Sequence, residues 1–102
     1  VYAENNATVI INSGEYRQQI TGDSTQYDLI YADDNAQIII NGGNFKADIP
    51  KWTLNCKDGS NAKITVNGGR FYKFNPETDN PKEVVLGGGH SVTQDGDWYI
   101  VQ

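Results

Sequence analysis

Two pairs of aspartates are the residues of this 102-residue chain that are best spaced for acid–base chemistry. Asp33 is followed directly by Asp34, and Asp95 stands two positions before Asp97. Two carboxylates held roughly 5–10 Å apart across a groove can cleave a glycosidic bond. Both pairs lie in segments that we expect to form turns, where aspartate is favoured because its side chain bonds to nearby backbone. We therefore expect no catalytic residue and no enzyme activity.

Metal and cofactor chemistry is equally poorly provided for. His90 follows three consecutive glycines, but no Lys-Ser/Thr pair follows them as a phosphate-binding loop requires. Cys56 is the only cysteine, so it cannot form an intrachain disulfide, and His90 alone does not complete a metal-ligand set with it. We expect Cys56 to be a buried thiol, and we expect no metal and no cofactor.

The residues best suited to contact a ligand lie in the connections that follow repeated segments. Arg17 and Gln18 stand in the first such connection, and Tyr72, Lys73 and Phe74 stand in the last. Aromatic faces can bind sugars or proteins at a low cost in conformational entropy. We predict these five residues as ligand-binding residues. The alternative is that the aromatic side chains only fix their loop to the strands or pack between subunits.

A segment that occurs three times must position these side chains. Residues 5–16, 34–45 and 60–71 read NNATVIINSGEY, DNAQIIINGGNF and SNAKITVNGGRF. Each copy opens with Asn-Ala and continues as an alternating apolar run, which is typical of a strand with one face inward. Each ends in Asn, then Gly or Ser, then Gly, one variable residue and an aromatic. A repeat that cannot bury its apolar face alone is typical of a solenoid.

The spacing of the copies favours a parallel β-helix. Their alanines lie 29 and 26 residues apart (36 − 7 and 62 − 36), and the pattern has no helical period and no leucine frame. We predict three to four rungs of two or three short strands each, stacked at about 4.8 Å. Stacking predicts five ladders: Ala7, Ala36 and Ala62; Val9, Ile38 and Ile64; Ile11, Ile40 and Val66; Asn12, Asn41 and Asn67; and Tyr16, Phe45 and Phe71.

One further strand is expected before each copy. Tyr27, Leu29 and Tyr31 alternate before the second copy, and a similar apolar alternation precedes the third. The strand at 84–86 is expected to be their counterpart in an incomplete fourth rung. The expected strands are residues 1–3, 27–31, 52–56 (with Trp52, Leu54 and Cys56) and 84–86.

The C-terminal segment predicts a cap for the stack. Asp-Gly lies between two β-prone runs, 91–93 and 98–101, which is a hairpin signal. A hairpin there would cover the last rung and protect its open edge. We therefore expect one all-β domain over residues 1–102, with rungs over about 1–86 and a capping hairpin over about 87–102. No cap is visible before the first copy, so we expect that edge to be covered by other residues or another subunit.

Charge excludes several classes of partner. The formal net charge is −5, and the eight Lys and Arg residues are scattered, whereas nucleic-acid binding needs a basic patch. An acidic surface also disfavours anionic membranes. The longest apolar runs, such as residues 38–40, are too short to cross a bilayer. We expect neither nucleic-acid binding nor membrane insertion.

The units INGGNF and VNGGRFYKFNP, followed by SVTQDGDWYIV near the C-terminus, carry a family resemblance. They resemble the right-handed parallel β-helix repeats of bacteriophage tailspike, tail-fibre and other virion surface proteins, and similar repeats occur in cell-surface proteins of gut bacteria. The resemblance runs from Asn5 to the end of the chain. It implies a homotrimer, located in the virion, extracellularly or at the cell surface, that contacts host-surface glycans or other virion proteins.

These observations lead to two functional hypotheses. The first is a non-enzymatic structural or attachment module of a phage virion or bacterial surface protein, assembled as an oligomer. The alternative is a glycan-binding or glycan-cleaving domain of a larger polysaccharide depolymerase.

Overall fold

A computed structural model shows that the chain is all-β, and it describes residues 1–18 and 28–102. The described residues form three sheets and one short 3-10 helix, η1 (Pro50–Trp52). The first sheet contains β1 (Tyr2–Ala3), β4 (Ile30–Ala32) and β7 (Leu54–Cys56). The second contains β2 (Thr8–Ile11), β5 (Gln37–Ile40), β8 (Lys63–Val66) and β10 (Val84–Leu86). The third contains β3 (Glu15–Arg17), β6 (Asn44–Lys46), β9 (Gly69–Tyr72), β11 (Val92–Asp95) and β12 (Trp98–Val101).

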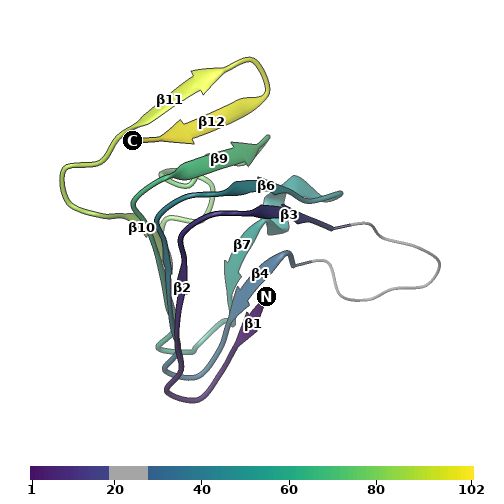
Figure 1. Cartoon of the computed structure of the whole chain (residues 1–102). Coiled ribbons are helices and arrows are strands. Elements are labelled where there is room, and N and C mark those ends of the chain that lie inside the picture. Colours follow the sequence, from purple (N-terminus) through teal and green to yellow (C-terminus); the bar gives the residue numbers. More distant parts are fainter. Residues whose placement is uncertain (19–27) are drawn as a thin grey trace.

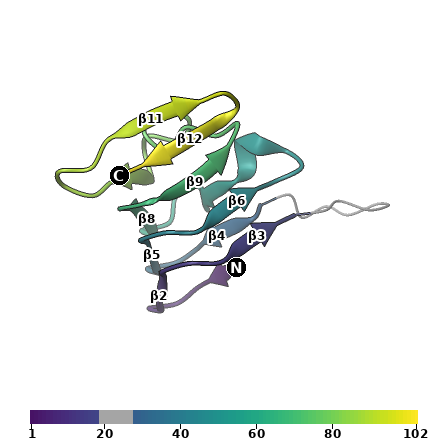
Figure 2. The same ribbon diagram turned by 45° about the horizontal axis from the view of Figure 1, so that its top comes forward.

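The chain visits the three sheets in the same order each time a repeat occurs. It passes through β1, β2 and β3, then through β4, β5 and β6, and then through β7, β8 and β9. Within each sheet, strands of successive passes lie side by side and parallel (Figures 1 and 2). Parallel pairing of the three copies, expected from the repeat, is therefore confirmed.

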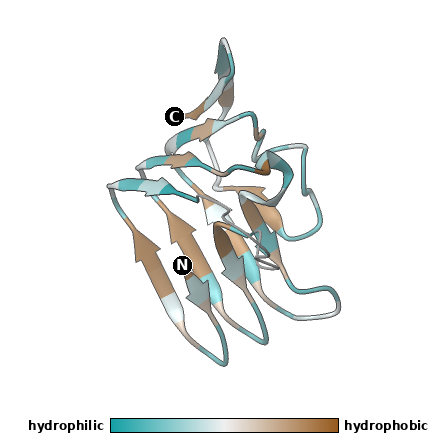
Figure 3. Cartoon of the chain, turned by 90° about the vertical axis from the view of Figure 1, so that its right-hand side faces the viewer, coloured by the Kyte–Doolittle hydropathy of each residue, from teal (hydrophilic) through white to brown (hydrophobic). Residues whose placement is uncertain are grey.

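The register of the pairing confirms the apolar ladders. Ile11 pairs with Ile40, which pairs with Val66. The ladder that begins at Val9 is formed in the same way. These side chains point between the sheets, where those of the second and third passes are fully buried. Figure 3 shows hydrophobic residues along the stacked strands and hydrophilic residues at the turns that join them.

The aromatic ladder forms one edge of this core. The rings of Tyr16 and Phe45 stack with centroids 4.9 Å apart, and those of Phe45 and Phe71 stack at the same distance. The interplanar angles are 8° and 7°. Phe45 is thus enclosed by a ring on each side and is fully buried. Burial of large apolar side chains of this kind is the main stabilising term for such a small domain.

Asparagine ladders run along the turns. The Asn41 amide nitrogen donates to the Asn12 side-chain oxygen at 2.9 Å, and the Asn67 amide nitrogen donates to the Asn41 oxygen at 3.0 Å. The predicted ladder is confirmed. A second ladder, which the sequence analysis did not anticipate, joins the asparagines that open the copies at 3.3 and 3.1 Å. Its members are Asn6, Asn35 and Asn61.

The glycine at each corner is explained by the pass beneath it. A Cβ on Gly42 would lie 2.6 Å from the backbone oxygen of Asn12, and a Cβ on Gly68 would clash even more closely with that of Asn41. Both clashes involve backbone atoms. Ser13 occupies this corner in the first copy, where β2 and β3 are edge strands of their sheets and no described strand lies beneath. The Gly-or-Ser variation therefore follows from position in the stack.

The strand before the second copy has a different phase from the one expected. Ile30 and Ala32 are the inward residues of β4, whereas Tyr31 points outward and stacks on Tyr2 with centroids 5.5 Å apart. Leu29 is buried immediately before the strand, and Tyr27 lies outside the described residues. Before the third copy, Leu54 and Cys56 face inward as expected, but Trp52 belongs to η1.

The strand at 84–86 belongs to another sheet than the one expected. β10 pairs with β8 in the second sheet, so it is the counterpart of the strands within the copies. The preceding loop carries Pro76 and Pro81, and Pro81 has no backbone N–H for strand pairing. In place of a first-sheet strand, the loop presents Asn80, whose amide nitrogen donates to the Asn55 side-chain oxygen at 3.0 Å.

The C-terminal hairpin is confirmed. β11 and β12 pair antiparallel, and Gly96 and Asp97 form the two-residue turn between them. Gly96 has φ +61°, which suits the first central position of such a turn. β12 also pairs antiparallel with β9, so the hairpin covers the last parallel strand of the third sheet (Figure 2).

Candidate functional site

The outer face of the third sheet carries the most prominent group of exposed functional side chains. Residues of β3, β6 and β9 alternate, so the positions on either side of each stacked aromatic point outward. Stacking of the three passes brings these outward side chains together, although they are spread over more than 50 residues of sequence. Strand β12 adds Trp98, which pairs with Tyr72.

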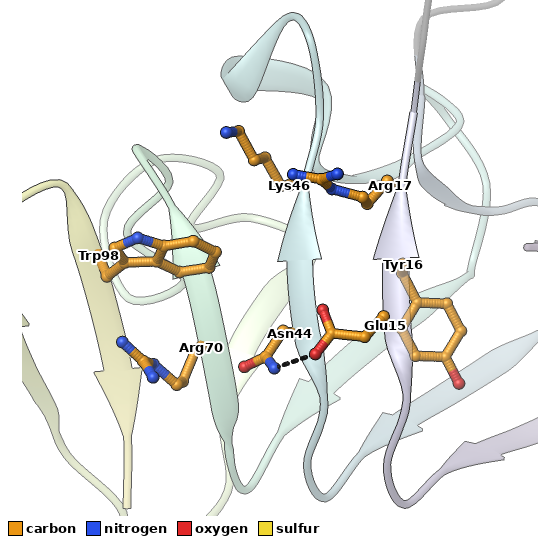
Figure 4. A pocket seen from close by; sticks show the side chains of 7 residues that line it. All are labelled: Glu15, Tyr16, Arg17, Asn44, Lys46, Arg70 and Trp98. Atoms are coloured by element: carbon orange, nitrogen blue, oxygen red, sulfur yellow. Dashed lines mark hydrogen bonds between the residues drawn. The ribbon is translucent and has the colours of Figure 1, made fainter.

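A shallow hollow of about 350 Å³ lies on this face. Figure 4 shows the side chains around it, which come from β3, β6, β9 and β12. We call this site the cationic hollow. It is lined by Glu15, Tyr16, Arg17, Asn44, Lys46, Arg70 and Trp98.

Cations and aromatic rings alternate around the cationic hollow. The Arg70 guanidinium carbon lies 5.3 Å from the centroid of the Trp98 ring, and the Lys46 ammonium lies 4.5 Å from the centroid of the Tyr72 ring. The rings of Tyr72 and Trp98 meet edge to face with centroids 5.4 Å apart. Cation–π contacts of this kind orient a cationic side chain without neutralising its charge.

The polar side of the cationic hollow is held by one hydrogen bond. The Asn44 amide nitrogen donates to a Glu15 carboxylate oxygen at 2.6 Å. Among residues 1–18 and 28–102, the one ion pair within 4.0 Å joins Lys57 to Asp33 on another part of the molecule. Neither arginine of the chain is therefore engaged by a carboxylate there, and their guanidinium donors face the hollow unneutralised.

Three of the predicted ligand-binding residues lie at or beside this site. Arg17 lines the cationic hollow. Tyr72 is half-buried next to Trp98 and Lys46, and Lys73 is exposed with its ammonium 5.3 Å from the centroid of the Tyr72 ring. The backbone nitrogen of Lys73 donates to the Asp97 carbonyl at 2.7 Å, which fixes the end of β9 to the hairpin.

The other two predicted residues are placed differently. Phe74 is fully buried, so its prediction as a ligand contact is wrong, and the alternative, in which it fixes its loop to the core, is confirmed. Gln18 is half-buried at the end of β3 and does not line the hollow, and its amide nitrogen donates to the Asp28 carbonyl at 3.4 Å.

The sequence analysis missed three residues that line the cationic hollow. Lys46, Arg70 and Trp98 occupy outward positions of strands that follow the corner glycines or form the cap. The signal was present, because the two-residue alternation continues past each corner through the aromatic. Extending that alternation by two positions would have placed Lys46 and Arg70 on one face.

The paired aspartates have backbone partners. An Asp33 carboxylate oxygen accepts from the Asp34 backbone nitrogen at 2.6 Å, and an Asp34 carboxylate oxygen accepts from the Asn5 backbone nitrogen at 2.9 Å. Asp97 lies in the hairpin turn and Asp95 ends β11. In the part of the chain that the structure describes, no group of three His, Cys, Asp or Glu residues could hold a metal ion.

Cys56 is a free, buried thiol, as expected from the sequence. Burial raises the pKa of this thiol to about 12, with a smaller contribution from the negative charge of Glu83. A thiol with so high a pKa remains protonated at neutral pH and is a poor nucleophile.

No known protein family, curated protein or solved structure matches this chain. In addition, no helix of the described residues is long and apolar enough to cross a membrane. The geometry of the cationic hollow and the fold around it therefore carry the functional argument.

Proposed function

We propose that this chain is a short right-handed parallel β-helix that serves as a non-enzymatic attachment module of a phage virion or bacterial surface protein. The fold part rests on the in-register pairing of successive passes in three sheets. The functional part rests on one observation. A hollow on the flat outer face of the third sheet combines an aromatic ring, Trp98, with unneutralised polar donors.

This combination suits carbohydrate. Sugars present apolar C–H faces and many hydroxyl groups, so sites for them pair aromatic rings with hydrogen-bonding side chains. The hydrogen-bonded Glu15 and Asn44 can accept and donate at hydroxyls, and Trp98 offers a ring at the other side. A rigid sheet positions these groups well, because their backbones are fixed by strand pairing on both sides.

Binding to immobilised host-surface polysaccharides tests the attachment function. We expect Trp98→Ala to weaken binding about tenfold or more, since stacked aromatic contacts are worth roughly 1–3 kcal/mol. Tyr2→Ala is the matched control, because it removes an exposed aromatic ring from the first sheet. Equal binding by both variants, or no binding of any polysaccharide by the natural chain, would refute the proposal.

The alternative of a glycan-cleaving domain has less support. Glu15 is the only carboxylate that lines the cationic hollow, whereas glycoside hydrolysis by the usual route needs two. Incubation with the same polysaccharides, followed by an assay for new reducing ends or unsaturated products, separates the two functions. Product that disappears in Glu15→Gln would replace attachment by cleavage.

We also propose that the module acts as an oligomer, with the trimer implied by the resemblance as the expected state. The second sheet supports this, because its outer face carries a stripe of β-branched residues, and Ile10 in that stripe is 58% exposed. Exposed apolar patches of this kind mark interaction surfaces. The stripe consists of Ile10, Ile39, Thr65 and Val85.

Light scattering tests the assembly. We expect three times the mass of one chain at high concentration, and a shift toward monomer for Ile39→Lys, which places a charge in the middle of the stripe. Lys63→Glu, on the same face but outside the stripe, is the control. A monomer at all concentrations for the natural chain would refute the assembly proposal and leave the attachment site untouched.

A further inference from the structure

The cationic hollow reverses the charge of the surface around it. The chain as a whole carries a net charge of −5. Nevertheless, three cations line the hollow against a single carboxylate, and they include both arginines of the sequence. A local excess of positive charge on an acidic protein creates a site that favours anions over the rest of the surface.

The arginines have donors available for an anionic ligand. Arg17 comes from β3 and Arg70 from β9, and β6 lies between these two strands. Among the described residues, neither guanidinium group forms an ion pair. A guanidinium group presents paired N–H donors that match carboxylate and sulfate oxygens, and its charge strengthens each hydrogen bond.

The third cation and the aromatic ring limit how a ligand can lie. Lys46 stands beside Arg17 on the neighbouring strand, with its ammonium group held over the Tyr72 ring. Arg70 is held beside the Trp98 ring. An acidic group bonded to Arg70 therefore brings the rest of its sugar next to Trp98. The volume of about 350 Å³ suits one or two sugar units.

We propose that the cationic hollow selects acidic oligosaccharides, whose carboxylate or sulfate groups bind Arg17, Lys46 and Arg70 while a sugar ring packs against Trp98. This inference rests on the proposed attachment function and names its ligand class. Glu15 and Asn44 then face the sugar hydroxyls. The same carboxylate disfavours a ligand that is anionic at every unit along its length.

Single-stranded nucleic acid is the other anionic polymer that combines charge with rings. It requires a positively charged groove that follows several phosphates. The cationic hollow has three lining cations and sits on a protein of net charge −5. The observations therefore favour the acidic sugar, and nucleic acid becomes an outcome of the test.

Matched pairs of oligosaccharides provide the experiment. Calorimetry with the whole chain would use galacturonate, glucuronate and sulfated galactose hexasaccharides. Their neutral partners would be the two methyl esters and the desulfated galactose hexasaccharide. We expect at least one acidic member to bind about tenfold or more tightly than its neutral partner, with the difference shrinking as salt is raised.

Variants locate the effect. Arg70→Gln and Arg17→Gln should each weaken binding of the acidic member about tenfold and leave the neutral member unchanged, since each removes one charge-assisted contact. Trp98→Ala should weaken both members. Lys63→Gln removes an exposed cation from the second sheet, and it should bind as the natural chain does.

Each outcome has a clear meaning. Equal binding of acidic and neutral members, or binding of neutral members alone, would overturn the inference while the attachment function stands. No binding of any member, together with no binding of host polysaccharides, would overturn both. Tighter binding of an oligodeoxythymidylate than of every acidic hexasaccharide would overturn the inference in favour of nucleic acid.

Discussion

Replacement of Gly68 by alanine is the sharpest test of the stacking. The added Cβ would collide with the backbone oxygen of Asn41, and it would also lie 3.0 Å from the Asn41 carbonyl carbon. These atoms belong to the backbone of the pass beneath, and the backbone nitrogen of Asn67 donates to the Ile40 carbonyl beside them at 2.7 Å. The clash therefore cannot be relieved by rotation of a side chain, and the two passes must separate at this corner.

Two opposing effects set the magnitude. Overpacking a close contact typically costs about 1–3 kcal/mol. Loss of glycine flexibility in the unfolded chain returns about 0.4–1 kcal/mol. We expect Gly68→Ala to lower the free energy of unfolding by about 2 kcal/mol, which is a large part of the roughly 5–15 kcal/mol typical of a small domain.

Urea unfolding followed by far-UV circular dichroism and tryptophan fluorescence measures this difference. Gly88→Ala is the matched control, because a Cβ there meets no atom within 4 Å and its φ lies outside the left-handed region. We expect that variant to be as stable as the natural chain, or more stable by about 0.5 kcal/mol. Gly42→Ala should lose less than Gly68→Ala, because its added Cβ would lie farther from the Asn12 oxygen than that of residue 68 from the Asn41 oxygen. If Gly68→Ala and Gly88→Ala unfold at the same urea concentration, the proposed approach of residue 68 to the Asn41 carbonyl is refuted.

Three further predictions concern the core, the turns and the thiol. Phe45→Ala should lower the free energy of unfolding by about 3–5 kcal/mol, because Phe45 is fully buried between two rings, whereas Tyr16→Ala at the half-buried end of the stack should lose less; urea unfolding compares them. Asn41→Ala should lose about 1–2 kcal/mol in the same assay, because it removes both the donor and the acceptor of the corner ladder, and no loss would contradict a stabilising role for that ladder. Cys56 should resist alkylation at pH 8 until urea unfolds the chain, and reaction at the rate of a free thiol in the folded protein would contradict its burial. Because the pKa of Cys56 is about 12 in the folded chain and 9.0 in the reference state, its contribution to stability should be fully present below pH 9 and lost between pH 9 and about 12, a dependence that Cys56→Ala should lack in unfolding measurements across that range.

The sequence predicted the parallel register because the same physical requirement recurs at each pass. A residue in a parallel stack packs against its equivalents above and below, so Ile40 and Asn41 resemble their counterparts in the other copies. Positions that meet their own kind in space can be recognised in the sequence as repeated letters. This is why the apolar, aromatic and asparagine ladders were all found.

Shorter strands outside the copies could not be placed in the same way. Leu29, Ile30 and Tyr31 are consecutive apolar residues, so a two-residue alternation can be drawn through either phase. Only pairing of Ile30 with Leu54 across the sheet decides which residues face inward. The strand at 84–86 lacks the corner motif altogether, so its sheet could not be read from the sequence.

The candidate site was found in part for a related reason. Arg17 was recognised because it follows a repeated segment directly. Arg70 and Trp98 lie 28 residues apart in sequence, and they meet because β12 folds back antiparallel on β9. Phe74 was misassigned because its loop turns inward over the end of the core, which a polar and proline-containing sequence does not reveal.

Ser13 gives the array a direction that can be read from letters alone. A side chain at this corner is harmless only in a layer whose neighbour contributes no carbonyl underneath it, so serine labels the bottom layer and glycine labels the layers built upon it. An engineer who wished to lengthen the protein could insert extra Asn-Gly-Gly units between the existing layers. Extension downward with the same unit would first require Ser13→Gly.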